Sequence, residues 1–528
     1  MPENYLIAIG GTGSRCLEAV IHLTAAGLFQ SPLRVLIIDP DQNNGNSVKT
    51  QSLISTYHVL HMAHQPAEAE RKRSILGWEK LPPPKLFQAS FNIRGAAAPA
   101  EQHATFWLNP NPAQRRFGEV IQYDAQQEDF KRFLDLFYEP NDLEMVLDVG
   151  YRGRTNVGAV ALKQDLEGTA GIAQGGLREF LERLNIALQT DEARVFVMGS
   201  VFGGTGAAGL PTIPQLIANL PADVIAKDNR ARLRYGCAMM TPYFSFPKGG
   251  GANSGPGTDS ARHAVATQAA LLHYAHVPPG YQHVYFIGAP ARPQTNGSNS
   301  VGGQNQTNDP HYAEIVAALA AWQFFSLKQV SPADRQLHFA DTMNDQQDAG
   351  VNWGTLPVNL ENTGSRDEIK RALTVFTTLA YFYKNFLYNS FINGQLYRDA
   401  NWYRDNFGAL SLDAEIPQLQ HLYDYCVSYL KWLAQVGETG RNATVRLFSW
   451  AALNESDTAL ADKHVGSLLD DPMSSSVNRS RAGFNDIYDR LDKLRLRQPG
   501  TNSAAGLFIY MLHQAVSEFC RENYAWRK

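Results

Sequence analysis

Apolar residues gather in short runs along the first part of the chain, and polar or glycine-rich turns separate them. Residues 5–9, 33–38, 144–149, 195–198, 233–240 and 283–287 each predict a buried strand. Helical spacing or composition predicts helices over 16–26, 176–188, 207–219, 258–276 and 308–325, the last with Asp309 as N-cap and Pro310 in its first turn. Alternating strands and helices predict an α/β fold with a parallel sheet.

The pattern changes beyond residue 325. A capping box at residues 365–368 opens a long aromatic helix, and residues 417–435, 475–496 and 504–524 predict further helices. Strand signals are sparse there, with 445–448 the best. We therefore expect two domains, a nucleotide-binding α/β domain over 1–325 and a mostly helical second domain over 326–528.

Two glycine turns join a predicted strand to a predicted helix. One contains Gly203, Gly204, Thr205 and Gly206, and the other contains Gly10, Gly11, Thr12, Gly13 and Ser14. Glycines let the backbone approach an anion, the loop N–H groups donate to it, and the helix N-terminus adds partial positive charge. The pattern favours a phosphate site, although a purely structural turn has the same composition. A Walker-type loop is excluded because it requires a Gly-Lys pair, which the chain lacks.

The run from Gly203 to Gly209 resembles the signature loop of the tubulin and FtsZ superfamily, with Ala208 inserted before the last glycine. Asp39-Pro40-Asp41 and the loop 150–158 resemble strand-end loops of FtsZ, and so does the phrase 241–249. The resemblance implies a doubly wound domain that binds GTP with Mg²⁺. It places Asp41 and Asn156 at the nucleotide, and Asn308 at the guanine, although Asn308 also suits a capping region.

Several site assignments keep a second interpretation. Arg152 could clamp a phosphate or lie in solvent. The first glycine turn with Asp39 also resembles a dinucleotide fingerprint, although Cys16 occupies its third position. An NAD-dependent enzyme therefore stays an alternative, but it leaves the turn at Gly203 unexplained.

Composition narrows the class of protein. The chain has 528 residues, 44% hydrophobic and 19% charged, which is typical of a globular protein with several packed regions. A net charge of −4 gives no reason to expect nucleic acid as a partner. Four dispersed cysteines and the lack of a long apolar run favour a cytoplasmic protein without a membrane span. No metal-ligand spacing occurs among the histidines.

The resemblance also implies assembly, since FtsZ-like proteins complete the nucleotide site of one subunit with an acidic loop from the next. Residues 328–348 hold that place, and Asp334, Asp341 and Asp345 are the catalytic candidates, without the Asn-x-Asp-x-x-Asp spacing of FtsZ. We expect head-to-tail self-association with slow or absent GTP hydrolysis. The alternative is a nucleotide-binding regulatory component of a bacterial defence or conflict system that acts with a protein partner.

Overall fold

The computed structural model describes most of the α/β part and most of the C-terminal helices. Its described residues are 3–41, 43–63, 86–91, 105–107, 115–148, 150–171, 176–244, 260–276, 280–289, 303–304, 306–340, 353, 356, 363–408, 410–439, 447–448, 453, 468, 483–496 and 503–524.

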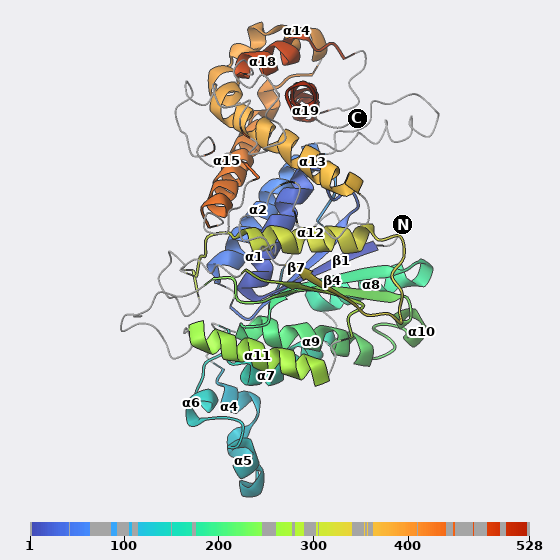
Figure 1. Cartoon of the computed structure of the whole chain (residues 1–528), viewed down its shortest axis with the longest axis vertical. Coiled ribbons are helices and arrows are strands. Elements are labelled where there is room, and N and C mark those ends of the chain that lie inside the picture. The colour runs from blue at the N-terminus through green and yellow to red at the C-terminus, as the bar shows by residue number, and fades with distance from the viewer. Residues whose placement is uncertain are drawn as a thin grey trace.

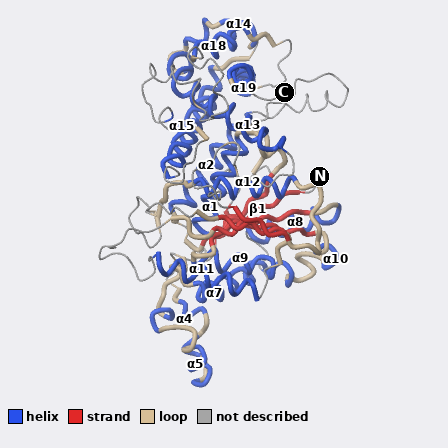
Figure 2. Tube along the Cα trace, viewed as in Figure 1, coloured by secondary structure: helices blue, strands red, loops and turns tan. Residues whose placement is uncertain are grey.

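A parallel β-sheet lies at the centre of the molecule (Figures 1 and 2). Within the described residues it has seven strands in the order β3-β2-β1-β4-β5-β6-β7. The strands are β1 (Glu3–Ile9), β2 (Leu33–Asp39), β3 (Thr105–Trp107), β4 (Ala193–Ser200), β5 (Leu233–Met240), β6 (His283–Ile287) and β7 (Gln336–Ala340). The chain runs outward in both directions from the pair β1 and β4, so the connections change direction between these two strands.

Helices cover both faces of the sheet because the central strands are apolar on both sides. Leu6 and Ala8 of β1 belong to one core, and Tyr5, Ile7 and Ile9 to the other. The first face carries α1 (Gly10–Ala25), α2 (Gly45–Ala63) and α12 (Tyr312–Ser326). The second carries α7 (Thr155–Gly171), α8 (Gly176–Thr190), α9 (Gly204–Asn219), the short α10 (Lys227–Arg230) and α11 (Ser260–His276).

The described elements after residue 363 are helical and extend the molecule beyond α2 and α12 (Figure 1). They are α13 (Thr363–Phe382), the π-helical segment Tyr383–Ile392, α14 (Asn401–Asn406), α15 (Ile416–Thr439), α18 (Phe484–Lys493) and α19 (Ala504–Asn523), with short 3₁₀ turns between them. Their apolar residues form one continuous core with α1 and α12. His22 of α1, for example, is fully buried against Tyr425 and Trp432 of α15. Among the described helices, none combines the length and apolar character needed to cross a bilayer.

A small protrusion extends from the opposite face of the molecule. It consists of α4 (Phe117–Val120), α5 (Glu128–Leu134) and α6 (Pro140–Leu143), with α5 at its tip (Figure 1). Phe117 and Val120 at its base are buried in the core of the second face.

The structure corrects several predicted elements. Residues 144–149 do not form a sheet strand: Val146 makes one isolated bridge to Arg116, and residue 149 lies outside the described residues. The third strand is instead β3. The N-cap of α12 is His311, whose Nδ1 accepts the backbone N–H of Ala313 at 3.1 Å, rather than Asp309. The strand predicted over 445–448 lies mostly outside the described residues.

Candidate functional site

The two glycine turns meet at the point where the sheet changes direction. β1 and β4 are parallel neighbours. α1 begins directly after β1, at Gly10, and α9 begins at Gly204, after the three-residue loop that follows β4. The turns touch, since a Cβ atom on Gly10 would lie 3.4 Å from the Cβ of Thr205. In open parallel sheets, ligands bind in the crevice outside the carboxyl ends of the strands at this switch point.

The glycines divide into two groups by what surrounds them. A Cβ on Gly13 would lie 2.7 Å from the carbonyl oxygen of Met198, and one on Gly206 would lie 2.5 Å from that of Ser200. These two glycines are therefore needed for α1 and α9 to pack against the strands. Four other residues of the turns stay partly exposed: Gly11, Thr12, Gly203 and Thr205. The two glycine turns together are called here the cradle. Its partly exposed residues are the ones that a ligand can reach.

A third loop, ahead of α7, completes this side of the crevice. A Cβ on Gly204 would lie 2.8 Å from the Cβ of Tyr151 and 3.1 Å from the backbone nitrogen of Gly153, so the loop packs on the first turn of α9. Arg152 in this loop is exposed and has a left-handed backbone, with φ of 43°. The structure therefore places the arginine beside the cradle.

Two polar residues at the start of α7 face the protrusion instead, Arg154 just before the helix and Asn156 in its first turn. The Asn156 side-chain amide donates to the carbonyl of Phe137 at 3.0 Å, so this predicted nucleotide contact points away from the glycine turns. Arg154 forms an ion pair with Asp142 of α6. Together they attach the protrusion to the loop that packs on α9.

On the other side of the cradle, the loop after β2 and the segment 303–308 bind each other. Asp41, which is buried, accepts the backbone N–H of Gly303 at 2.6 Å. Asn308 donates its backbone N–H to Asn46 at 3.1 Å, and Asn44 donates to Gln306 at 2.9 Å. These contacts place Asn308 near Gly11.

Sequence reasoning missed two of the asparagines in this network. A Cβ on Gly11 would lie 3.1 Å from the amide nitrogen of Asn44 and 3.3 Å from that of Asn46. Both asparagines are buried. Asn46 holds Asn308 in place and Asn44 holds Gln306, so neither presents itself to a ligand. The signal was visible as an asparagine cluster directly after the acidic strand end.

The acid at the end of β2 faces inward. Asp39 is 2% exposed and accepts the Ser47 hydroxyl at 2.9 Å and the backbone N–H of Asp41 at 3.1 Å. Burial raises the pKa of Asp39 to about 7 and also raises the pKa of Asp41. Ser14 is fully buried, with its hydroxyl 2.9 Å from that of Ser47, so it contacts α2 and not the open part of the cradle.

A buried ion pair connects α1 to α12 beneath the cradle. Arg15 Nε lies 3.0 Å from Glu314 Oε1, and Tyr243 donates to the same carboxylate at 2.7 Å. Burial raises the pKa of Glu314, and the charge of Arg15 opposes this shift. A buried pair of this kind fixes the position of α1 relative to α12, because either charge left alone in the core would be strongly unfavourable.

Of the three predicted catalytic acids, the structure describes Asp334, and it does not lie near the glycine turns. Asp334 is exposed and lies between α12 and β7, which places it at the amino ends of the strands, opposite the glycine turns. Asp341 and Asp345 lie outside the described residues. Among the described residues, no group of three or more acidic, cysteine or histidine side chains is arranged to hold a metal ion.

Four helix N-termini therefore gather at the carboxyl edge of the sheet, those of α1, α2, α7 and α9, and glycines open the way to two of them. This arrangement attracts an anion and offers it backbone donors. No protein-family model matches the chain, and no curated protein or solved structure matches it either.

Proposed function

We propose that the crevice between α1 and α9 binds GTP through its phosphates. The observation that carries the proposal is the contact between two glycine turns at the switch point, each of which opens a helix. Gly11, Thr12, Gly203 and Thr205 would lie against the phosphates, and Mg²⁺ would arrive with the nucleotide. We further propose that GTP-bound copies associate head to tail with slow or absent hydrolysis, in the manner of the tubulin and FtsZ superfamily.

The environment of Asp39 supports this proposal over an NAD-dependent enzyme. In a dinucleotide fold the acid at the end of the second strand binds the ribose. Here its oxygens accept from Ser47 and from the backbone of Asp41, and the side chain is buried. Asp41, two residues later, is buried as well and accepts the backbone N–H groups of Gly303 and Asn43, so the proposal rests on the glycine turns and not on this acid. A regulatory protein that binds nucleotide without turnover fits the same geometry.

The test changes Thr205, which is partly exposed and lies where the two turns meet. Gly204 is unsuitable because any side chain there would meet Tyr151. Thr205→Glu puts a carboxylate where the phosphates would lie, and Thr205→Gln has the same size without the charge. Because like charges brought together cost several kcal/mol, we expect the Glu variant to bind GTP about a hundredfold more weakly and the Gln variant less than about tenfold more weakly.

Titration calorimetry with GTP measures both affinities, and circular dichroism checks that both variants fold. Identification of the nucleotide that copurifies with the unmodified protein decides between GTP and NAD. Equal affinity of the Glu and Gln variants for GTP would refute the phosphate site. Copurified NAD would refute the choice of nucleotide.

A further inference from the structure

Helix α5, at the tip of the protrusion, and the turn after it, residues 135–137, turn aromatic side chains toward solvent. Phe130, Phe133 and Phe137 are 48%, 51% and 56% exposed, and Leu136 is 77% exposed. The ring centroids of Phe130 and Phe133 are 5.8 Å apart, and those of Phe133 and Phe137 are 5.1 Å apart. The three rings therefore form one continuous surface, called here the aromatic strip. Exposed apolar clusters of this kind mark interaction surfaces.

The strip lacks the support that a helix of this length needs. None of the seven residues of α5 is buried. Tyr123 holds it from one side, with its hydroxyl 2.7 Å from Asp135 and its ring under the Lys131 ammonium at 5.8 Å. A helix of about two turns is not stable alone, and an amphipathic helix normally buries its apolar face. The apolar face of α5 is therefore shaped to pack against something outside this protomer.

The charge around the strip is acidic. Between residues 123 and 139 the sequence has five carboxylates and two cations. Both cations already have acidic neighbours on α5, with Lys131 3.3 Å from Glu128 and Arg132 3.9 Å from Asp129. The surplus is negative, and a complementary surface would be positive.

We propose that the aromatic strip docks into an apolar groove of another protein whose rim carries lysine and arginine. Phe130 and Phe133 lie one turn apart on α5 and Phe137 lies in the turn that follows it, so the three adjacent rings can enter one groove together. This inference does not depend on nucleotide binding, because the strip lies at the tip of the protrusion and not in the crevice.

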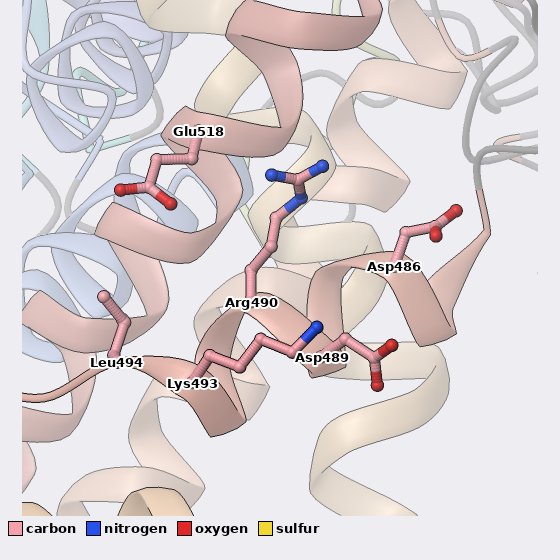
Figure 3. Close-up of a pocket in the computed structure, with 6 residues that line it drawn as sticks. All are labelled: Asp486, Asp489, Arg490, Lys493, Leu494 and Glu518. Carbon is pink, nitrogen blue, oxygen red and sulfur yellow. The ribbon is translucent and has the colours of Figure 1, made fainter.

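A second copy of this chain does not offer such a groove in the cavity that the structure describes on α18 and α19 (Figure 3). That cavity has about 320 Å³, and five of its six lining residues are charged: Asp486, Asp489, Arg490, Lys493 and Glu518, with Leu494 as the sixth. Burying phenylalanine rings there would desolvate charges without compensating them. This cavity therefore does not fit the strip. We assign the groove to a different protein, and a second copy is the competing outcome of the test below.

The test uses the full-length protein and a synthetic probe. The probe is a fluorescein-labelled two-helix hairpin peptide with a leucine groove and a lysine rim, and its counterpart carries glutamates in place of the lysines. Fluorescence anisotropy should show binding to the lysine hairpin at least about tenfold tighter than to the glutamate hairpin. Phe130→Ser/Phe133→Ser/Phe137→Ser should weaken binding of the lysine hairpin by at least about tenfold, since aromatic anchors dominate such contacts.

Val265→Ser/Leu272→Ser provides a matched control, because these α11 residues are also exposed, at 67% and 55%, but lie outside the strip. It should leave the affinity within about twofold. Equal binding of the two hairpins would overturn the basic partner, and unchanged binding by the triple variant would overturn the strip as the surface. Self-association in sedimentation that only the triple variant abolishes would identify a second copy as the occupant and overturn the proposal.

Discussion

Asn308 and Asn46 show how a single pair of side chains positions a candidate base contact. The Asn46 carboxamide accepts the backbone N–H of Asn308 at 3.1 Å, and its amide nitrogen lies 3.5 Å from the Asn308 oxygen. Asn46 is buried, whereas Asn308 is half-buried. The backbone of Asn308 is thus anchored by one neighbour while part of its side chain stays accessible to a ligand.

This arrangement predicts how the nucleotide preference responds to substitution. A side-chain amide can donate to the guanine O6 and accept from its N1–H, whereas adenine presents the opposite pattern. Asn308→Leu should therefore reduce the ratio of GTP to ATP affinity by about tenfold, the effect of one or two hydrogen bonds. Asn46→Ala, which removes only the anchor, should lower the same ratio by a smaller factor, because Asn308 keeps its amide but is held less firmly. Calorimetry with both nucleotides measures the ratios, and an unchanged ratio in Asn308→Leu would exclude this residue as the base contact.

Asp39 makes folding stability depend on pH. Burial raises its pKa from the ordinary 3.8 to about 7, so between these values the folded chain keeps a proton that the unfolded chain has lost. The contribution to stability is therefore largest at acid pH and is lost as pH rises through this window, by about 1.4 kcal/mol per pH unit.

Asp39→Asn keeps the shape of the protonated side chain without the titration. Between about pH 5 and about pH 7, the unfolding free energy of the unmodified protein should fall by about 2–3 kcal/mol relative to this variant. Urea unfolding at several pH values measures the difference. Asp334→Asn, at an exposed carboxylate, serves as the control. Parallel curves for Asp39→Asn and the unmodified protein would contradict the raised pKa.

The sequence identified the glycines of the cradle as candidate phosphate contacts, but it did not show which of them are needed for packing and which stay accessible. Gly13 and Gly206 serve close packing, and Gly11 and Gly203 stay accessible. This distinction depends on which backbone atoms face each α-carbon, so it arises only when α1 and α9 are placed on the sheet. Ser14 was predicted at the nucleotide for its place in the turn, but the structure buries it against Ser47.

Among the elements, α9 shows how tertiary contacts make an unfavourable helix sequence acceptable. The helix contains Pro211 and Pro214, which lack the N–H groups that would bond to the carbonyls of Ala207 and Leu210. Two buried tyrosines replace the missing donors. The hydroxyl of Tyr274 donates to Ala207, and that of Tyr281 donates to Leu210, both at 2.6 Å. The helix that begins at Gly204 is thus completed by side chains outside it.

The replacement predicts a specific energetic coupling. Tyr281→Phe leaves the Leu210 carbonyl buried without a donor and should cost about 1–3 kcal/mol of unfolding free energy. In a Pro214→Ala background the same change should cost less than half as much, since the new backbone N–H can reach that carbonyl. A Pro211→Ala background, which restores a donor to Ala207 instead, should give no rescue. Urea unfolding of the six proteins measures the cycle, and an equal cost of Tyr281→Phe in all three backgrounds would exclude this account.

In two other segments, the secondary structure differs from the one that the hydrophobic pattern predicted. Residues 144–149 were predicted as a strand because they are apolar, and Met145 and Leu147 are indeed buried, but they fill the core of the second face without joining the sheet. β7 was not predicted because residues 328–348 were interpreted as an acidic loop, although Leu337 and Phe339 alternate with polar residues as in a strand. A run of apolar residues indicates that a segment is buried. Whether that segment forms a sheet strand depends on which other segments lie beside it.

At the scale of the whole molecule, the sheet separates the glycine turns from Asp334, the one predicted catalytic acid among the described residues. The glycine turns lie at the carboxyl edge and Asp334 lies at the amino edge, so a strand length of about 20 Å stands between them. Within one copy they cannot act on the same phosphate. If copies stack carboxyl edge to amino edge, Asp334 of one copy approaches the nucleotide of the next.

In head-to-tail stacking, each copy uses two different surfaces, its carboxyl edge and its amino edge. This asymmetry distinguishes such stacking from a symmetric dimer. With GTP, the unmodified protein should show rising light scattering and sedimentation, while phosphate release stays slow or absent. Thr205→Glu should not assemble alone, because its carboxyl edge carries no nucleotide.

The same variant keeps its amino edge, so it should add to one end of a growing chain of subunits and stop further growth there. A heterologous contact propagates only through copies that are competent on both surfaces. About one part Thr205→Glu in ten should therefore lower scattering by roughly half or more, far beyond simple dilution, whereas the same fraction of Thr205→Gln should not. A decrease equal to dilution would show that the two edges do not meet, and rapid phosphate release by a dilute monomer would show that the catalytic groups lie within one chain.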